Sequence, residues 1–148
     1  MLDIGLWIML WSLFQGFPAC PVEGIVSSPY GKRIDPISHR RRWHQGLDVA
    51  ADKGTPIHSM FEGKVVASRR SRGYGRWVYV RTNRILVRYA HMDEVYVERG
   101  QRVFRGEVIG AVGDTGRATG PHLHLEVWDH GETKDPWRYA HLCFYERL

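Results

Sequence analysis

Residues 122–127 read His-Leu-His-Leu-Glu-Val, and this stretch carries the clearest signal for the architecture. Polar and apolar side chains alternate strictly along it, and residues two apart lie on the same face of a β-strand. One face of the predicted strand therefore carries His122, His124 and Glu126, while the three apolar residues between and after them face a core. Packing does not explain two histidines on one face of a strand, and a neutral imidazole nitrogen is a common zinc ligand. The stretch thus predicts both a half-buried strand and a metal site.

Short segments of the same kind recur along the chain and predict an all-β domain. Gly, Pro and Asn separate them, and none has a convincing 3.6-residue period. The predicted strands are Gln45–Ala50, Gly63–Ser68, Trp77–Arg81, Ile85–His91, Val103–Phe104, Val108–Val112 and His122–Trp128. Two similar stretches, residues 54–66 and 100–110, each place an apolar strand after a turn led by Gly. We therefore expect a compact antiparallel sheet or barrel-sandwich hybrid that contains a duplicated motif.

The connections between these strands are predicted from their turn residues. Thr82-Asn83-Arg84 lies between two predicted strands and indicates a hairpin. Residues 32–43 contain Pro36 and four arginines without periodicity, so we expect a loop there. Residues 135–148 are expected to form a short terminal helix.

Length and composition indicate one globular domain with a basic surface. The chain has 148 residues, of which 43% are hydrophobic and 25% charged, and its formal net charge is +5. A basic surface suits a polyanionic partner, but the arginines are scattered apart from residues 40–42 and 69–72, and no nucleic-acid-binding motif is present. We therefore expect no nucleic acid partner, and a monomer, because nothing in the sequence indicates an obligate oligomer.

The N-terminus differs in character from the rest of the chain. We expect an apolar N-terminal segment at residues 1–20 and one domain at residues 21–148. The apolar run within residues 1–19 is shorter than the roughly 20 residues that a membrane-spanning helix needs. It fits an export signal, or an uncleaved helix that docks on the domain or contacts a membrane. The sequence leaves open whether Cys20 and Cys143 form a disulfide or remain free thiols.

Two other places in the sequence add metal-ligand chemistry. In His44-Gln45-Gly46-Leu47-Asp48, a single strand would place His44, Gly46 and Asp48 on one face, with space at the glycine between the two polar groups. His91 ends an apolar predicted strand, where residues of functional sites often emerge. Histidine and carboxylate therefore occur in three separate places that a β fold could bring together.

The number of these ligands indicates the kind of metal site. Two histidines and one carboxylate supply three protein ligands and leave a fourth position for water, which is the pattern of a catalytic zinc site. The remaining histidines would then be free to act as acid, base or oxyanion stabiliser. Alternation alone does not decide whether His122 or His124 takes the metal.

These motifs match a known family. The chain resembles the lysostaphin-like (LytM-type) zinc endopeptidases over roughly residues 24–138. The matching stretches are Ser28-Pro29-Tyr30-Gly31-Lys32-Arg33, His44-Gln45-Gly46-Leu47-Asp48, Gly54-Thr55-Pro56, Gly63-Lys64-Val65, Tyr89-Ala90-His91-Met92, Gly100-Gln101-Arg102-Val103, Gly106, Ile109-Gly110, Gly113-Asp114-Thr115-Gly116, Gly120-Pro121-His122-Leu123-His124-Leu125-Glu126 and Asp135-Pro136. The order and spacing of the three histidine motifs are highly specific when taken together.

The resemblance implies a cofactor, an activity and a set of site residues. It implies that zinc is bound by His44, Asp48 and His124, and that His91 and His122 are the catalytic pair outside the ligand set. It implies a metalloendopeptidase that hydrolyses peptide bonds in peptidoglycan with zinc-activated water, and hence a periplasmic, cell-envelope or extracellular location. The resemblance leaves open whether glycine-rich cross-bridges or direct D-amino-acid cross-links are cut. It also leaves open whether the enzyme serves a bacterium that remodels its own wall or a phage that releases its progeny.

Two other functions fit parts of the sequence. A non-catalytic zinc-binding regulator of another cell-wall hydrolase would have this fold, but all five site positions are intact. Residues 97–113 resemble half of a biotinyl or lipoyl carrier barrel, yet such carriers need an exposed Lys at a hairpin tip, and residues 81–84 contain none. A phosphoryl carrier would use one histidine and leave the other three unexplained.

Overall fold

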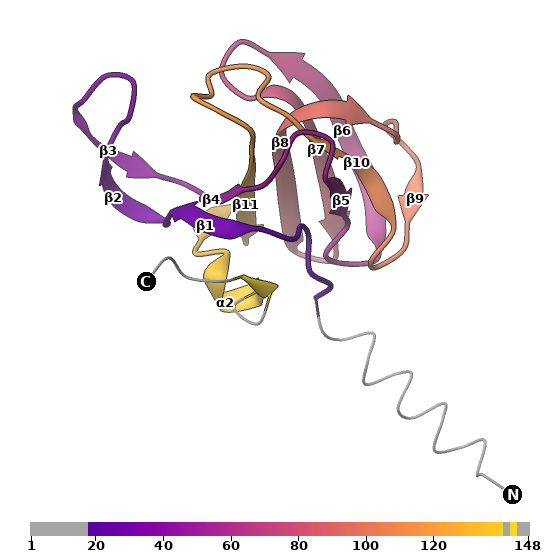
Figure 1. Cartoon of the computed structure of the whole chain (residues 1–148). Helices are drawn as coiled ribbons and strands as arrows, with labels where there is room; N and C mark the ends of the chain where they lie inside the picture. The colour runs from indigo at the N-terminus through magenta and orange to yellow at the C-terminus, as the bar shows by residue number, and fades with distance from the viewer. Residues whose placement is uncertain (1–17, 141–142, 145–148) are drawn as a thin grey trace, which may run out of the picture.

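The computed structural model describes residues 18–140, 143 and 144, and nearly all of its regular elements are β-strands (Figure 1). The strands are β1 (Ile25–Ser28), β2 (Gly31–Ile34), β3 (Arg41–His44), β4 (Leu47–Ala50), β5 (Pro56–His58), β6 (Gly63–Ser71), β7 (Gly75–Thr82), β8 (Ile85–Val95), β9 (Arg102–Val103), β10 (Val108–Val112), β11 (His122–Asp129) and β12 (Glu132–Lys134). A single turn of helix, α2, spans Trp137–Ala140. The all-β prediction is therefore confirmed.

Most of the strands belong to one antiparallel sheet. Within the described part of the chain, ten strands form this sheet, and β2 pairs with β3 in a separate hairpin. The main path runs β1-β4-β11-β8-β7-β6-β9, while β10 joins through β8 and β5 and β12 through β11. In Figure 1 the β2–β3 hairpin extends away from the body of the sheet. The strand β11, predicted from its alternation, lies between β4 and β8 and so at the centre of the domain.

The core lies against the apolar face of β11. Leu123, Leu125 and Val127 are 0% exposed, as the alternation of this strand predicts. Removing each such side chain from water stabilises the fold by roughly 1.5–3 kcal/mol. Tyr89 on the neighbouring β8 is also fully buried, and its hydroxyl accepts the backbone N–H of Met60 at 2.8 Å. The apolar face is therefore closed, and the polar face of β11 is free to carry a site.

The stretch predicted as a loop, residues 32–43, forms most of a hairpin instead. Gly31–Ile34 and Arg41–His44 pair in antiparallel register as β2 and β3. Lys32, Ile34 and the residues from Arg41 to Trp43 are exposed, so no buried face imposes an apolar alternation on the sequence. This lack of a buried face explains why the prediction was wrong.

The predicted single strand over residues 45–50 is also wrong at its start. β3 ends at His44 and β4 begins at Leu47, so Gln45 and Gly46 form a bend between two strands. A Cβ atom at Gly46 would lie 2.5 Å from the Leu125 carbonyl oxygen and 2.7 Å from the His124 ring. Gly46 therefore admits the histidine ring and the backbone of β11, rather than leaving space between two polar groups of one strand.

The two ends of the described chain are joined covalently. Cys20 and Cys143 form a disulfide, with their Cα atoms 5.2 Å apart, which settles the alternative that the sequence left open. A short helix, Trp137–Ala140, lies within the predicted range, and Asp135 caps it by accepting the N–H of Trp137 at 3.0 Å. Residues 1–17 lie outside the described residues, so the apolar segment stays a prediction. Across the described ranges, no helix is long and apolar enough to cross a membrane.

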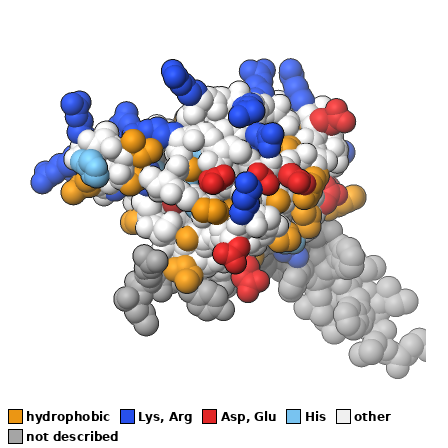
Figure 2. Space-filling view, turned by 45° about the horizontal axis from the view of Figure 1, so that its top comes forward, with side chains coloured by type: hydrophobic (Ala, Val, Ile, Leu, Met, Phe, Trp, Pro, Cys, Tyr) orange, Lys and Arg blue, Asp and Glu red, His pale blue; other side chains and the backbone are white. Residues whose placement is uncertain are grey.

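On the face shown in Figure 2, charged side chains are spread out rather than gathered in one patch. Figure 2 shows Lys and Arg side chains over much of one face, with acidic side chains between them. This distribution agrees with the interpretation of the net charge of +5 as a generally basic surface.

Candidate metal centre

The structure brings His44, Asp48 and His124 together on the polar face of the sheet. β4 pairs with β11 so that Asp48 lies directly opposite His124, and His44 approaches from the end of β3. Asp48 Oδ1 lies 2.7 Å from His124 Nδ1 and 3.2 Å from His44 Nε2, and the two ring nitrogens are 3.2 Å apart. All three residues are buried. Ligand atoms about 2.0–2.1 Å from a tetrahedral zinc lie roughly 3.3 Å apart, so this donor set fits the ion.

A separate group orients each of the three side chains. His44 Nδ1 donates to the Pro29 carbonyl at 2.8 Å, which leaves Nε2 for the cluster. Arg33 Nη1 donates to Asp48 Oδ2 at 2.8 Å, which leaves Oδ1. His124 Nε2 donates to Glu126 Oε1 at 3.0 Å, which leaves Nδ1. Partners of this kind fix the tautomer and direction of metal ligands.

The electrostatics of the cluster favour a positive charge at its centre. Burial opposes ionisation of Asp48, but the hydrogen bonds from His124 and His44 outweigh it and hold the carboxyl pKa below its usual range. Burial also opposes protonation of His124, yet Asp48 and Glu126 together raise its pKa to about 9. Two carboxylates thus surround the His124 imidazole. Without a metal, the additional proton on His124 supplies the compensating positive charge, and a bound divalent cation would supply that charge instead.

The two other predicted histidines lie beside this cluster. The rings of His91 and His122 are 4.7 Å apart between centroids, and the ring of His91 is 5.8 Å from that of His124. His91 Nδ1 donates to the Thr115 carbonyl at 2.7 Å, and His122 Nδ1 donates to the Gly120 carbonyl at 2.8 Å. Each ring therefore uses Nδ1 for a backbone hydrogen bond, and Nε2 of His122 lies 3.7 Å from Asp48 Oδ1.

His91 is held as a neutral base. Burial, together with the neighbouring rings of His122 and His124, lowers its pKa to about 4 against the opposing effect of its hydrogen bond to Thr115. Its backbone has φ of 59°, a left-handed conformation that is uncommon for a residue other than glycine. Non-glycine residues in this conformation cluster at functional sites. All five predicted site residues are thus gathered in one place, and their individual roles stay predictions.

A network of residues that the sequence analysis did not assign lies behind His124. Glu126 is 0% exposed and accepts hydrogen bonds from Tyr74, Arg88 and Trp128 at 2.9, 3.0 and 2.9 Å, besides that from His124. The Arg88 guanidinium also lies over the Tyr74 ring, 4.0 Å from its centroid. The sequence could have indicated Glu126 as a site residue, because it lies on the same strand face as the two histidines. The sequence around Tyr74 and Arg88 contains no such indication.

A second pair of ions joins the segments around the cluster. Asp35, the first residue after β2, is 3% exposed and accepts two hydrogen bonds from Arg117 at 2.8 and 2.9 Å. Arg117 belongs to the same loop as Thr115, whose carbonyl holds His91. The pair therefore ties the hairpin that ends at His44 to the loop that positions His91.

Comparison with known proteins identifies peptidases as relatives of this chain. The model of Peptidase family M23 matches residues 42–136, which include all five site residues. The chain is 44% identical over 112 residues to the DD-carboxypeptidase/endopeptidase Mpg of Neisseria meningitidis, covering 75% of this chain and 26% of the relative. It is 38% identical over 115 residues to the peptidoglycan DD-endopeptidase ShyA of Vibrio cholerae, covering 77% and 27%. The chain thus spans about a quarter of the length of these curated relatives.

Solved structures confirm the resemblance to the lysostaphin-like enzymes. A zinc-containing peptidase from Vibrio cholerae is 36% identical, with a TM-score of 0.73 over 80% of this chain and 37% of that one. The catalytic domain of lysostaphin from Staphylococcus simulans is 28% identical, with a TM-score of 0.72 over 78% and 91%. With the family model matched over residues 42–136 and the buried histidine–aspartate cluster inside that range, the chain belongs to peptidase family M23.

Proposed function

We propose that this chain is a zinc-dependent endopeptidase that hydrolyses peptide bonds in peptidoglycan. The observation that carries the proposal is the geometry of the five residues. Three buried ligand atoms of His44, Asp48 and His124 converge, and the two histidines beside them, His91 and His122, each use Nδ1 for a hydrogen bond to a backbone carbonyl. A three-ligand zinc site with a free position and nearby proton carriers is typical of a hydrolase.

The roles of the residues follow from their contacts. His44, Asp48 and His124 would hold the ion, which supplies Lewis acidity and lowers the pKa of its bound water toward about 7. His91 is neutral because burial lowers its pKa to about 4, so its Nε2 can accept a proton or a hydrogen bond. His122 is the more exposed of the pair, with 14% of its side chain accessible, and it can pass a proton between the site and water.

The names of the relatives favour one class of substrate bond. Mpg is named a DD-carboxypeptidase/endopeptidase and ShyA a peptidoglycan DD-endopeptidase, and their identities of 44% and 38% exceed the 28% of lysostaphin. We therefore propose cleavage of direct cross-links between D-amino acids rather than of glycine-rich bridges. Mass analysis of the muropeptides released from a directly cross-linked wall would show monomers growing at the expense of dimers, and unchanged dimers would contradict this choice.

A location outside the cytosol agrees with the substrate. The disulfide between Cys20 and Cys143 supports an oxidising compartment, because such bonds are rare where thiols are kept reduced. We propose residues 21–148 as the peptidase domain, and the cell envelope or the extracellular space as its location. N-terminal sequencing of the exported protein would show whether residues 1–19 are removed.

The activity is tested with purified peptidoglycan. Zinc-loaded protein should lower the turbidity of a wall suspension, a chelator should stop the clearing, and added zinc should restore it. The regulator alternative predicts no clearing by folded, zinc-loaded protein at any concentration, and that result would end the enzyme proposal. Among the described residues nothing favours the regulator, because the three converging ligand atoms and both adjacent histidines are present.

A further inference from the structure

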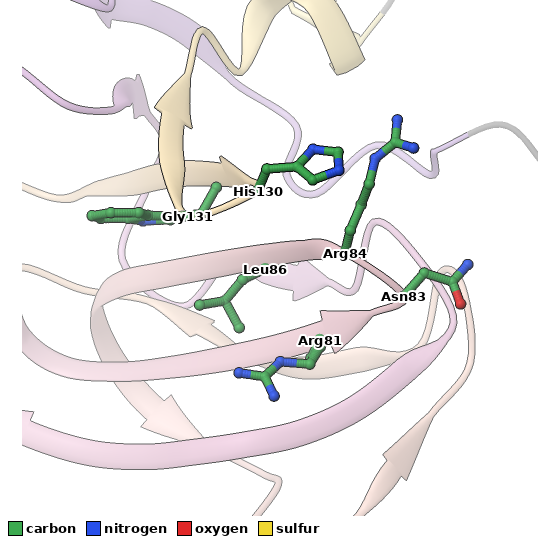
Figure 3. Close-up of a pocket in the computed structure, with 7 residues that line it drawn as sticks. Arg81, Asn83, Arg84, Leu86, His130 and Gly131 are labelled. Atoms are coloured by element: carbon green, nitrogen blue, oxygen red, sulfur yellow. The ribbon is translucent and has the colours of Figure 1, made fainter.

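A pocket lies away from the metal cluster, where two turns meet. Its volume is about 360 Å³, within the range of small-ligand sites. Its lining residues are Arg81, Asn83, Arg84, Leu86, Trp128, His130 and Gly131. The β7–β8 turn and the β11–β12 turn border it, and in Figure 3 Leu86 lies between Arg81 and the pair formed by Arg84 and His130. None of these residues belongs to the five-residue site.

The register of the sheet places this pocket on the same face as the cluster. Trp128 Nε1 donates to Glu126 Oε2 at 2.9 Å, and Glu126 in turn accepts from His124. Leu86 lies directly opposite Trp128 on β8, and Arg81 directly opposite Leu86 on β7. Trp128 follows His124 by four residues, which is roughly 13 Å at about 3.3 Å per residue. Arg81 lies two strands across the sheet from β11, at about 4.8 Å per strand, so its separation from the cluster is roughly 16 Å and an extended peptide of about five residues would span it.

In this part of the sheet positively charged side chains lie opposite one another, which lowers the stability of the fold. Arg81 lies directly opposite Lys64 on β6, and Lys64 lies directly opposite Arg102 on β9. Like charges directly opposite each other destabilise a sheet. Arg102 has an ion pair with Glu62, but across the described ranges the side chains of Arg81 and Lys64 have no hydrogen bond or ion pair. A bound anion would remove this repulsion.

The remaining residues of the pocket are held in place and offer further contacts. Arg84 Nε donates to Asp129 Oδ1 at 2.9 Å, and His130 Nδ1 lies 2.9 Å from the same oxygen. One carboxylate thus fixes two side chains at the rim while Arg81 stays unpaired. Trp128 and Leu86 are half-buried and give the pocket an apolar floor. Guanidinium groups bind carboxylates with two parallel hydrogen bonds, and such charge-assisted bonds are strong.

We propose that this pocket binds a carboxylate of the peptide substrate through Arg81, about five residues from the bond that is cut. The inference rests on the proposed function, because a peptidoglycan peptide supplies both the scissile bond and free carboxylates. Trp128 and Leu86 contact the aliphatic part of the bound peptide. Arg81 is a specificity-determining residue and not a catalytic one, since it lies far from the reacting atoms.

The test measures binding and cleavage separately. Zinc-loaded protein is titrated with an acidic tetrapeptide that has no cross-link, and with the same peptide after amidation of its carboxylates. The wild type should bind the acidic form about tenfold more tightly, and Arg81→Gln should remove the difference. Arg81→Lys should keep part of it. Arg99→Gln, the same change of charge at an exposed turn, should bind as the wild type does.

Kinetics on a soluble cross-linked peptide complete the test. Arg81→Gln should raise KM about tenfold with a much smaller change in kcat, and the circular dichroism spectrum should match that of the wild type. Equal binding of the acidic and amidated peptides by the wild type would overturn the pocket inference even if the wall is cleared. Acid-selective binding that depends on Arg81 would support the pocket even if no clearing occurs, in which case only the proposed function falls.

Discussion

The polar face of β11 carries one group of side chains at each end of the strand, and the two groups differ in burial although the same alternation of residues produces both. At one end His124 and Glu126 are 7% and 0% exposed, and both are held by several hydrogen bonds. At the other end the side chains of His130 and Arg84 are 72% and 64% exposed and share one carboxylate. The closed end is suited to hold an ion in one geometry, whereas at the open end Arg81 has no ion pair within the described residues and can bind a ligand. The strand pattern is the same at both ends, so it is burial that determines which end can hold an ion and which end can bind a ligand.

The largest effect should come from removing a single imidazole at the closed end. His124→Ala should lose zinc, to less than about a tenth of the wild-type content, and lose activity by a thousandfold or more, since one of three ligands is gone. His122→Ala should keep its zinc and still lose activity by about a hundredfold or more, because only a proton carrier is removed. Metal analysis after dialysis distinguishes the two variants. Equal zinc content in both would refute the ligand assignment.

A smaller effect is expected when the orienting carboxylate is neutralised. Glu126→Gln should weaken zinc binding by about 10- to 100-fold, because the acceptor that fixes the His124 tautomer loses its charge. Competition with a chromogenic chelator gives the affinity. Glu132→Gln makes the same chemical change at an exposed position of β12 and should leave the affinity unaltered. Matching affinities for the two variants would show that the network behind His124 is only structural.

The segments that enclose the closed end should confer a pH-dependent stability. The hydrogen bonds from Arg117, with those from the backbone of residues 37 and 38, hold the pKa of Asp35 below its ordinary value of 3.8 despite its burial. A depressed pKa contributes stability above the unfolded-state value, and this stability is lost as pH falls below about 4. Asp35→Asn should therefore destabilise the protein by about 1–3 kcal/mol at pH 7 and by clearly less at pH 3.

Urea unfolding of the wild type and of Asp35→Asn at the two pH values measures this difference. Zinc is added at pH 7 in one series and omitted in another, so that loss of the metal at low pH is not mistaken for loss of the ion pair. A penalty of equal size at pH 7 and pH 3 would contradict the assignment to the Asp35–Arg117 pair.

The smallest effect is expected at the open end. Arg84→Gln removes an exposed ion pair with Asp129, and such pairs contribute about 0–1 kcal/mol. The free energy of unfolding should change by less than about 0.5 kcal/mol, and zinc affinity should not change. A loss above 2 kcal/mol would mean that the open end is as tightly coupled as the closed end, and the contrast between them would disappear.

Several parts of this molecule follow from local sequence alone. The alternation in residues 122–127 predicted the central strand and its two faces, because side chains of a strand alternate whatever surrounds them. The hairpin at Thr82-Asn83-Arg84 followed from turn residues, and Asn83 has the positive φ that such turns require. The chemistry of histidine and aspartate, with the motif resemblance, singled out all five residues that the structure gathers.

Other parts depend on neighbours that are distant along the chain. The β2–β3 hairpin has no buried face to leave an apolar pattern, and the break between His44 and Leu47 exists because Gly46 packs against the backbone and a side chain of β11. Tyr74, Arg88 and Arg117 acquire their partners only when strands and loops that are 38 to 82 residues apart come together. Strand pattern and residue chemistry are local properties and can be read in order along the chain. Burial, register and charge pairing arise between segments, so they determined which of these side chains form a closed site and which stay open.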